Sequence, residues 1–148
     1  MNIKRYLDLA AQVSRLKDDD RTYFHGAVGI RKDGVLVAAC NGSPKEPTPE
    51  HHCEYRLSRK LGKAGTVFLV RTAADGRWAD STPCSTCQAR MRNKKVRRVY
   101  FSTGPGDWRL WDLKLQYYPP APMVGLDAWL PQYTGISTLL QVNKTLHL

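Results

Sequence analysis

The chain has no apolar run that approaches the length of a membrane-spanning helix, and no apolar segment before a small-residue cleavage site at its N-terminus. We therefore expect neither a membrane anchor nor a secretion signal. Cysteine is also scarce, with four among 148 residues, and this number does not suggest a disulfide framework. Internal repeats and low-complexity tracts are lacking. The sequence thus predicts a single domain over residues 1–148, located in the reducing cytoplasm.

Negative charge is in short supply as well. The sequence holds 23 Lys and Arg residues against 13 Asp and Glu residues, which gives a formal net charge of +10. A small domain with this charge produces a positive field that attracts phosphate-bearing partners, and nucleic acid is the first candidate. Net charge alone does not separate this role from that of a basic surface that only favours solubility, so both interpretations stay open.

What the sequence does contain is a set of metal-binding residues at two short spacings. His52 and Glu54 stand two positions apart, and Pro83, Cys84 and Cys87 follow in the order P-C-x-x-C. One imidazole and two thiolates fill three positions of a zinc tetrahedron and leave the fourth to a water, whose pKa the metal lowers towards neutrality. Glu54 is not needed as a ligand, so its carboxylate can serve as a general acid and base.

This combined pattern, H-x-E and P-C-x-x-C, resembles the signature of the cytidine and deoxycytidylate deaminase superfamily, over about residues 22–103. The resemblance implies a three-layer α/β fold with a central five-stranded mixed sheet flanked by helices, which residues 104–148 would complete. It also implies one Zn2+ per chain. In that arrangement, His52, Cys84 and Cys87 bind the metal and Glu54 is the catalytic residue.

The residues by themselves leave a second interpretation open, which is a closed structural zinc site. A lone C-x-x-C pair also occurs in redox motifs and in zinc knuckles. A closed site needs a fourth ligand, and the candidates are Cys40, His51 and Cys53. This interpretation gives no role to Glu54.

Apolar periodicity predicts helices that alternate with strands, as in a sheet covered by helices. Both ligand segments then lie at helix N-termini, where the positive end of the helix dipole favours thiolates. His52 is expected in the first turn of its helix. The expected elements, in chain order, are a helix at 3–17 capped by Asn2, a hairpin of strands at 25–30 and 35–40, a helix from Thr48 to about Lys60, a strand at 66–71, a helix from Pro83 to about Asn93, and a strand at 96–101.

Other segments are less regular. Residues 73–81 are expected to form a loop that turns at Asp75-Gly76, and residues 107–118 are a candidate helix. Residues 123–148 would supply a fifth strand and a last helix, for which the sequence gives no clear bounds.

A loop at 102–111 is expected beside the mouth of the pocket, because it follows the strand after the cysteine-bearing helix. It combines Trp108, Arg109 and Trp111, and aromatic rings interleaved with arginine suit a surface that stacks bases and follows phosphates. The alternative is that both tryptophans pack onto the sheet.

Further roles follow from the resemblance. Asn41, in Asn41-Gly42, would contact the sugar of the substrate, although such a residue is also common in turns. Backbone atoms near Thr82 would accept the exocyclic amine of the base, and the threonine departs from the glutamate that many members carry there. Cys53 is expected to be a buried apolar thiol. His25 is expected to be a structural histidine near the site, and the alternative is that it reaches a phosphate or a base.

The predicted activity is hydrolytic deamination of cytosine to uracil. The net charge and the aromatic-basic loop favour cytosine in single-stranded DNA. The alternative is a free pyrimidine nucleotide such as deoxycytidylate, which the Asn41-Gly42 match favours, and adenine in tRNA is a third substrate. Outside the enzymes, a zinc-stabilised nucleic-acid-binding module remains an alternative. The sequence does not give the oligomeric state.

Overall fold

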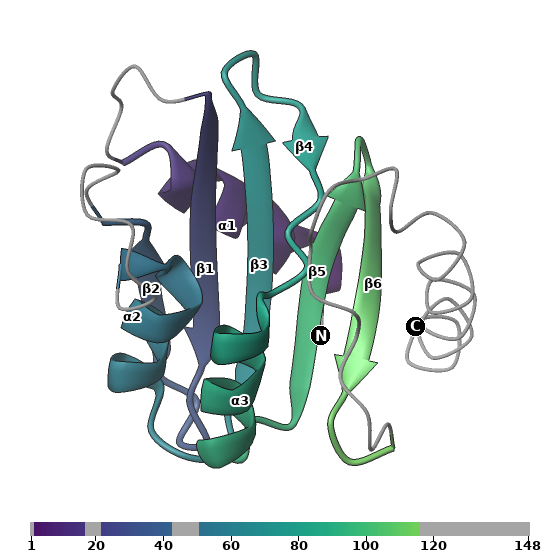
Figure 1. The fold of residues 1–148 in the computed structure, drawn as a ribbon. Helices are drawn as coiled ribbons and strands as arrows, with labels where there is room; N and C mark the ends of the chain where they lie inside the picture. The colour runs from purple at the N-terminus through teal and green to yellow at the C-terminus, as the bar shows by residue number, and fades with distance from the viewer. Residues whose placement is uncertain (1, 17–21, 43–50, 116–148) are drawn as a thin grey trace.

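The computed structural model describes residues 2–16, 22–42 and 51–115. Within these ranges a sheet carries helices on both of its faces, with α1 behind it and α2 and α3 in front (Figure 1). The helices are α1 (Ile3–Ser14), α2 (Cys53–Leu61) and α3 (Ser85–Asn93). The strands are β1 (Tyr23–Ile30), β2 (Leu36–Cys40), β3 (Thr66–Ala73), β4 (Trp78–Ala79), β5 (Arg98–Gly104) and β6 (Asp107–Asp112).

The sheet is mixed, as predicted. Its order is β2-β1-β3-β5-β6, and only the pair of β3 and β5 is parallel among these neighbours. The five strands in this order match the predicted central sheet, although its fifth strand is β6 and was expected from residues 123–148. The short strand β4 pairs with β3 in addition. The three-layer α/β prediction is therefore confirmed for the described part of the chain.

Apart from shifts in the ends of elements, two segments differ in kind from the sequence-based expectation. The expected loop at 73–81 contains β4, which returns along β3 after a turn at Gly76 with φ 90°. The expected loop at 102–111 and the candidate helix at 107–118 are wrong for the described residues, because β5 continues to Gly104 and β6 pairs with it as a hairpin. Residues 116–118 and 123–148 lie outside the described residues.

The helix α1 has the cap and the buried stripe that its sequence predicts. The Asn2 side chain accepts a hydrogen bond from the Arg5 N–H, and Leu7 and Ala10 are fully buried against the sheet. Packing is so close that a Cβ at Gly26 of β1 would overlap the backbone of α1. None of the helices in the described ranges is both long and apolar enough to cross a membrane.

On the other face, α2 and α3 lie side by side over the middle of the sheet (Figure 1). Their buried side chains, including Leu57 and Met91, pack on alternate residues of the strands, such as Leu69 and Phe101. The intervening residues of the same strands, such as Phe68, face α1. The period-2 alternation of the apolar strands thus fills two separate cores, and one of them supports the helix starts described next.

Candidate metal centre and active site

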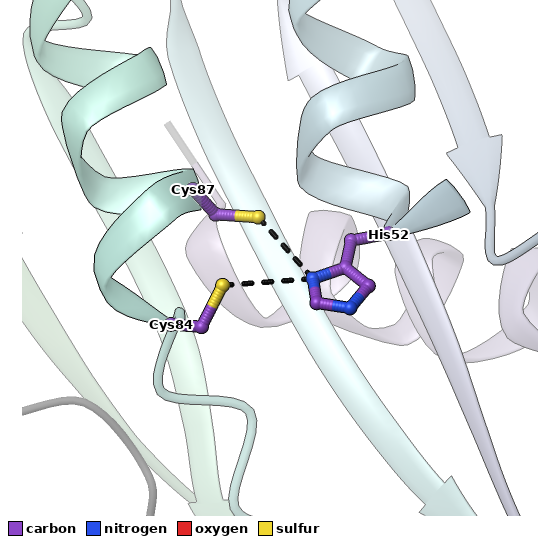
Figure 2. A group of neighbouring side chains, drawn as sticks. All are labelled: His52, Cys84 and Cys87. Atoms are coloured by element: carbon purple, nitrogen blue, oxygen red, sulfur yellow. Dashed lines mark hydrogen bonds between the residues drawn. The ribbon is translucent and has the colours of Figure 1, made fainter. Parts of the chain in front are cut away.

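The three predicted zinc ligands meet where α2 and α3 begin. His52 and Cys84 each precede a helix with extended backbone, at φ −68°, ψ 143° and φ −68°, ψ 165° respectively, and Cys87 follows in the first turn of α3. The prediction that His52 lies inside the first turn is therefore off by one position, since α2 starts at Cys53. Figure 2 shows the imidazole and the two sulfur atoms pointing toward one another from the two helix ends.

The distances among these side chains fit a tetrahedral zinc site. The Nδ1 atom of His52 lies 3.5 Å from the Sγ atom of Cys84 and 3.5 Å from that of Cys87. Ordinary Zn–N and Zn–S bond lengths at a tetrahedral angle separate the nitrogen and the sulfur by about 3.6 Å. One nitrogen and two sulfurs are also the donor set that zinc prefers. The residues present therefore fit the metal that the resemblance implies.

The fourth position decides between an open site and a closed one. In the described part of the chain, the group around His52 contains only Cys84 and Cys87. Cys40 packs against the core on the α1 face, and the thiol of Cys53 hydrogen-bonds to Glu54 instead. His51 does not join the group either. This arrangement favours an open catalytic site over a structural knuckle.

The protonation of the two cysteines is uneven. Hydrogen bonds with Cys87 and His52 stabilise the thiolate of Cys84 and lower its pKa to about 4. The pKa of Cys87 is raised, because its thiol is engaged with Cys84 and because it is buried. The pKa of His52 is raised by its hydrogen bond with Cys84. Metal ligands must be deprotonated, so binding of zinc would release the remaining thiol proton.

Glu54 stands next to this group but outside it. Its side chain lies in the first turn of α2 and is only 7% exposed. The carboxylate belongs to a neighbouring group with His25 and Cys53, in which one ligand atom of each residue lies within 4.8 Å of the others. A buried carboxylate beside an open metal position, and not among the ligands, has the placement of a general acid and base.

Asn41 is fixed at the start of α2. Its Oδ1 atom accepts the Cys53 N–H at 2.7 Å, which satisfies one of the unpaired donors at the helix N-terminus. The adjacent Gly42 N–H donates to the carbonyl of His51 at 2.7 Å, and a Cβ at Gly42 would lie 2.5 Å from the imidazole Nδ1 of His51. The Asn-Gly pair therefore needs its glycine for close packing, and it holds the amide of Asn41 beside the site.

The segment before α3 is held by its own hydrogen bonds. Thr82 is buried, and its N–H and hydroxyl both donate to one carboxylate oxygen of Asp80, at 2.8 and 2.6 Å. The side chain of Gln88 donates to the carbonyl of Pro83 at 2.8 Å. Thr82 thus lies where the resemblance requires a fixed backbone, and its contact with the substrate remains a prediction.

Trp108 and Arg109 do not form the predicted surface. Trp108 is 8% exposed and packs edge-on against Tyr100 in the core on the α1 face, with ring centroids 5.8 Å apart. Trp111 is fully buried on the other face. Arg109 pairs with Asp107 at 2.7 Å, and its side chain is 16% exposed. The alternative in which both tryptophans pack onto the sheet is the one observed, because β6 alternates its side chains between the two cores.

The sequence places His25 near the site but gives no signal that it lies beside Glu54. His25 was expected to be a structural histidine, and the structure brings it into the group with Cys53 and Glu54. The hairpin of β5 and β6, by contrast, had a signal in Gly104-Pro105-Gly106 between two alternating apolar runs. Gly106 has φ 64° there, which suits glycine.

Comparisons with known proteins support the same interpretation of the site. Residues 1–103 match the family model described as "Cytidine and deoxycytidylate deaminase zinc-binding region". The structure is similar to the cytidine deaminase from Bacillus anthracis, with 13% identity, a TM-score of 0.53 and coverage of 90% of this chain and 96% of that chain. It is also similar to the cytidine deaminase from Mycobacterium leprae, with 14% identity, a TM-score of 0.50 and coverage of 74% and 93% respectively. No curated protein matches the chain. At such identities, the structural likeness shows a shared fold.

Proposed function

Since the chain belongs to the family of cytidine and deoxycytidylate deaminases, through the zinc-binding region at residues 1–103, we propose that it catalyses the hydrolytic deamination of a cytosine ring. The observation that carries this proposal is the position of the His52 Nδ1 atom, 3.5 Å from both cysteine sulfurs. The buried Glu54 lies on the same helix start.

In this reaction, water adds at C4 of the ring, the amino group leaves as ammonia, and uracil remains. His52, Cys84 and Cys87 would hold the zinc. When bound, the metal supplies Lewis acidity that makes a water nucleophilic near neutral pH. The Glu54 carboxylate accepts a proton from the water and passes it on towards the ring nitrogen and the departing amine.

For the substrate, we propose a free cytidine or deoxycytidine nucleoside or nucleotide. Asn41 supports this choice, because its Oδ1 atom is taken by the Cys53 N–H and its amide NH2 group is the part that remains to donate to a sugar hydroxyl. The family description and the structural relatives both name cytidine or deoxycytidylate as the substrate of those proteins. The aromatic-basic loop that favoured DNA is part of a hairpin, and both of its tryptophans are buried.

Cytosine in single-stranded DNA is the second candidate. It is favoured by the net charge of +10, which would attract a polyanion. The two candidates differ in how their use depends on salt. A strand that contacts several basic residues releases several counterions, with a log–log slope of about −0.7 for each phosphate contact on single strands. A mononucleotide carries one phosphate group and should show a shallow dependence.

The test is a substrate panel assayed for uracil. Cytidine, deoxycytidine, deoxycytidylate and single-stranded oligonucleotides would each be incubated with the zinc-loaded protein, with Glu54→Gln as the control for contaminating deaminases. We expect turnover of a free nucleoside or nucleotide that depends on Glu54. Uracil that forms only in oligonucleotides would select the second candidate, and no uracil in any substrate would reject deamination of cytosine.

A further inference from the structure

A small polar group joins the start of α2 to β1. It consists of His25 from β1 and of Cys53 and Glu54 from α2, with one nitrogen, sulfur and oxygen atom all within 4.8 Å of one another. Cys53 and Glu54 are buried and His25 is partly exposed. The group is separate from the zinc ligands, and the reaction proposed above assigns a role only to its carboxylate.

Cys53 contacts Glu54 directly. The Sγ atom of Cys53 donates to the Oε1 atom of Glu54 at 2.9 Å, and the side chain of Cys53 is 1% exposed. Its own backbone is anchored, because its N–H donates to Asn41. The bond engages one of the two carboxylate oxygens, Oε1, and so restrains the orientation of the whole group. A side chain without a donor at this position would leave the carboxylate held by fewer contacts.

His25 reaches the same group from the sheet. It shares a face of β1 with Ala27, which belongs to the core around Cys53 and Cys87. The carbonyl of His25 accepts the N–H of Asn41 at 3.3 Å, so β1 and the segment that anchors α2 are joined at this point. One imidazole nitrogen of His25 lies within 4.8 Å of the thiol of Cys53 and of a carboxylate oxygen of Glu54.

We propose that Cys53 and His25 are positioning residues that hold the carboxylate of Glu54 in the orientation needed for proton transfer. This inference rests on the proposed deamination, because it assigns the two residues to the group that moves the proton. Proton transfer requires the donor and acceptor atoms to be within hydrogen-bond reach. A carboxylate fixed at Oε1 presents Oε2 in one place, whereas an unrestrained carboxylate rotates among several.

The main test replaces the thiol. Cys53→Ala removes a hydrogen bond to a charged group, and the loss of such a bond should lower kcat about 10- to 100-fold. KM and the zinc content should stay at the values of the unaltered protein, since Cys53 is buried and does not belong to the group of candidate zinc ligands. Cys53→Ser restores a donor of similar size and should recover most of the lost kcat. His25→Ala should lower kcat in the same way, with partial recovery in His25→Gln.

Cys40→Ala is the matched control. That thiol lies on the α1 face of the sheet, where its loss removes packing and no contact with Glu54. We expect its kcat to remain that of the unaltered protein. If Cys53→Ala behaves like Cys40→Ala while Glu54→Gln is inactive, the positioning role is wrong and the deaminase proposal stands.

A second measurement does not depend on catalytic activity. Urea unfolding of the zinc-free protein would be compared for Cys53→Ala, Glu54→Ala and the double variant. If the two side chains interact, the shift of the double variant should be smaller than the sum of the two single shifts. Strictly additive shifts would overturn the positioning role of Cys53. Because this test does not depend on turnover, it separates a failure of the positioning role from a failure of the proposed function.

Discussion

The two faces of the sheet are made by the same strands and are covered by different helices (Figure 1). They bury different sets of side chains. On the α1 face, aromatic rings stack in a row from Tyr6 over Phe68 to Tyr100, with centroids 5.0 and 5.1 Å apart, and Trp108 closes it edge-on. On the face of α2 and α3, the core includes cysteines and borders a buried carboxylate.

This difference has a physical meaning. Burial of apolar and aromatic area is stabilising, so the α1 face contributes to the free energy of folding. A buried carboxylate and two thiols confined near an imidazole contribute less to stability and are found where reactivity is needed. We therefore expect changes on the α1 face to alter stability, and changes at the helix starts of the other face to alter chemistry.

The largest effect should come from removing a metal ligand on the reactive face. Cys84→Ser replaces a thiolate whose pKa is already lowered to about 4 with a hydroxyl that does not ionise near neutral pH. Zinc should fall well below one atom per chain, and turnover should be lost with it. Elemental analysis of purified protein measures this, and an undiminished zinc content would show that the ligand assignment is wrong.

Next in size is the loss of the general acid and base. Glu54→Ala should keep zinc and fold but reduce turnover by about 10²–10⁴-fold, the usual contribution of such a group. Zinc analysis and circular dichroism, taken alongside the rate, separate the two effects. If zinc is lost together with activity, Glu54 is a ligand and the site has a different design.

A change on the α1 face should lower stability and leave the chemistry unchanged. Leu7 is fully buried in α1, and Leu7→Ala should lower the free energy of unfolding by about 2–5 kcal/mol. Because α1 packs on the face of the sheet opposite α2 and α3 (Figure 1), kcat of the folded fraction and the zinc content should not change. Urea unfolding and a rate assay at low temperature check both halves, and a changed kcat with unchanged stability would break the comparison.

A smaller effect is expected at the edge of the site. Asn41→Asp keeps the oxygen that accepts the Cys53 N–H, and its charge suits a helix N-terminus, so stability should hold. It removes the amide donor, and KM for cytidine should rise about 3- to 10-fold, as for loss of one hydrogen bond. An unchanged KM would remove Asn41 from the sugar contact. Asn41→Ala, which loses both functions, should also lower stability.

The smallest effect concerns substrate choice. Trp108→Leu keeps an apolar side chain on the α1 face but removes the aromatic ring. If that ring stacked on a base, its loss would weaken the binding free energy of an oligonucleotide by roughly 1–3 kcal/mol. The binding of a mononucleotide would not change. We expect the ratio of the two rates to stay the same, because Trp108 is buried against Tyr100. A selective loss on the oligonucleotide would restore the DNA-stacking role.

Local patterns were enough to predict most of the elements. Asn2 before a helical stripe, and Asp33-Gly34 between two apolar runs, gave the cap and the hairpin that the structure has. They failed for 107–112, where Trp, Arg and Leu suit either a helix or a strand, and pairing with β5 decides between them. The start of α2 at Cys53 rather than earlier also depends on contacts that a sequence pattern does not contain.

The sequence by itself determined the candidate ligands and the general acid and base, because zinc chemistry requires His52, Cys84, Cys87 and Glu54 as residue types at short spacings. Only the tertiary structure decided which other side chains share that space. Strand pairing placed Trp108 on the far face and His25 close to Glu54. Both outcomes follow from the register of strands that are distant in the chain, where a shift of one residue exchanges the two faces.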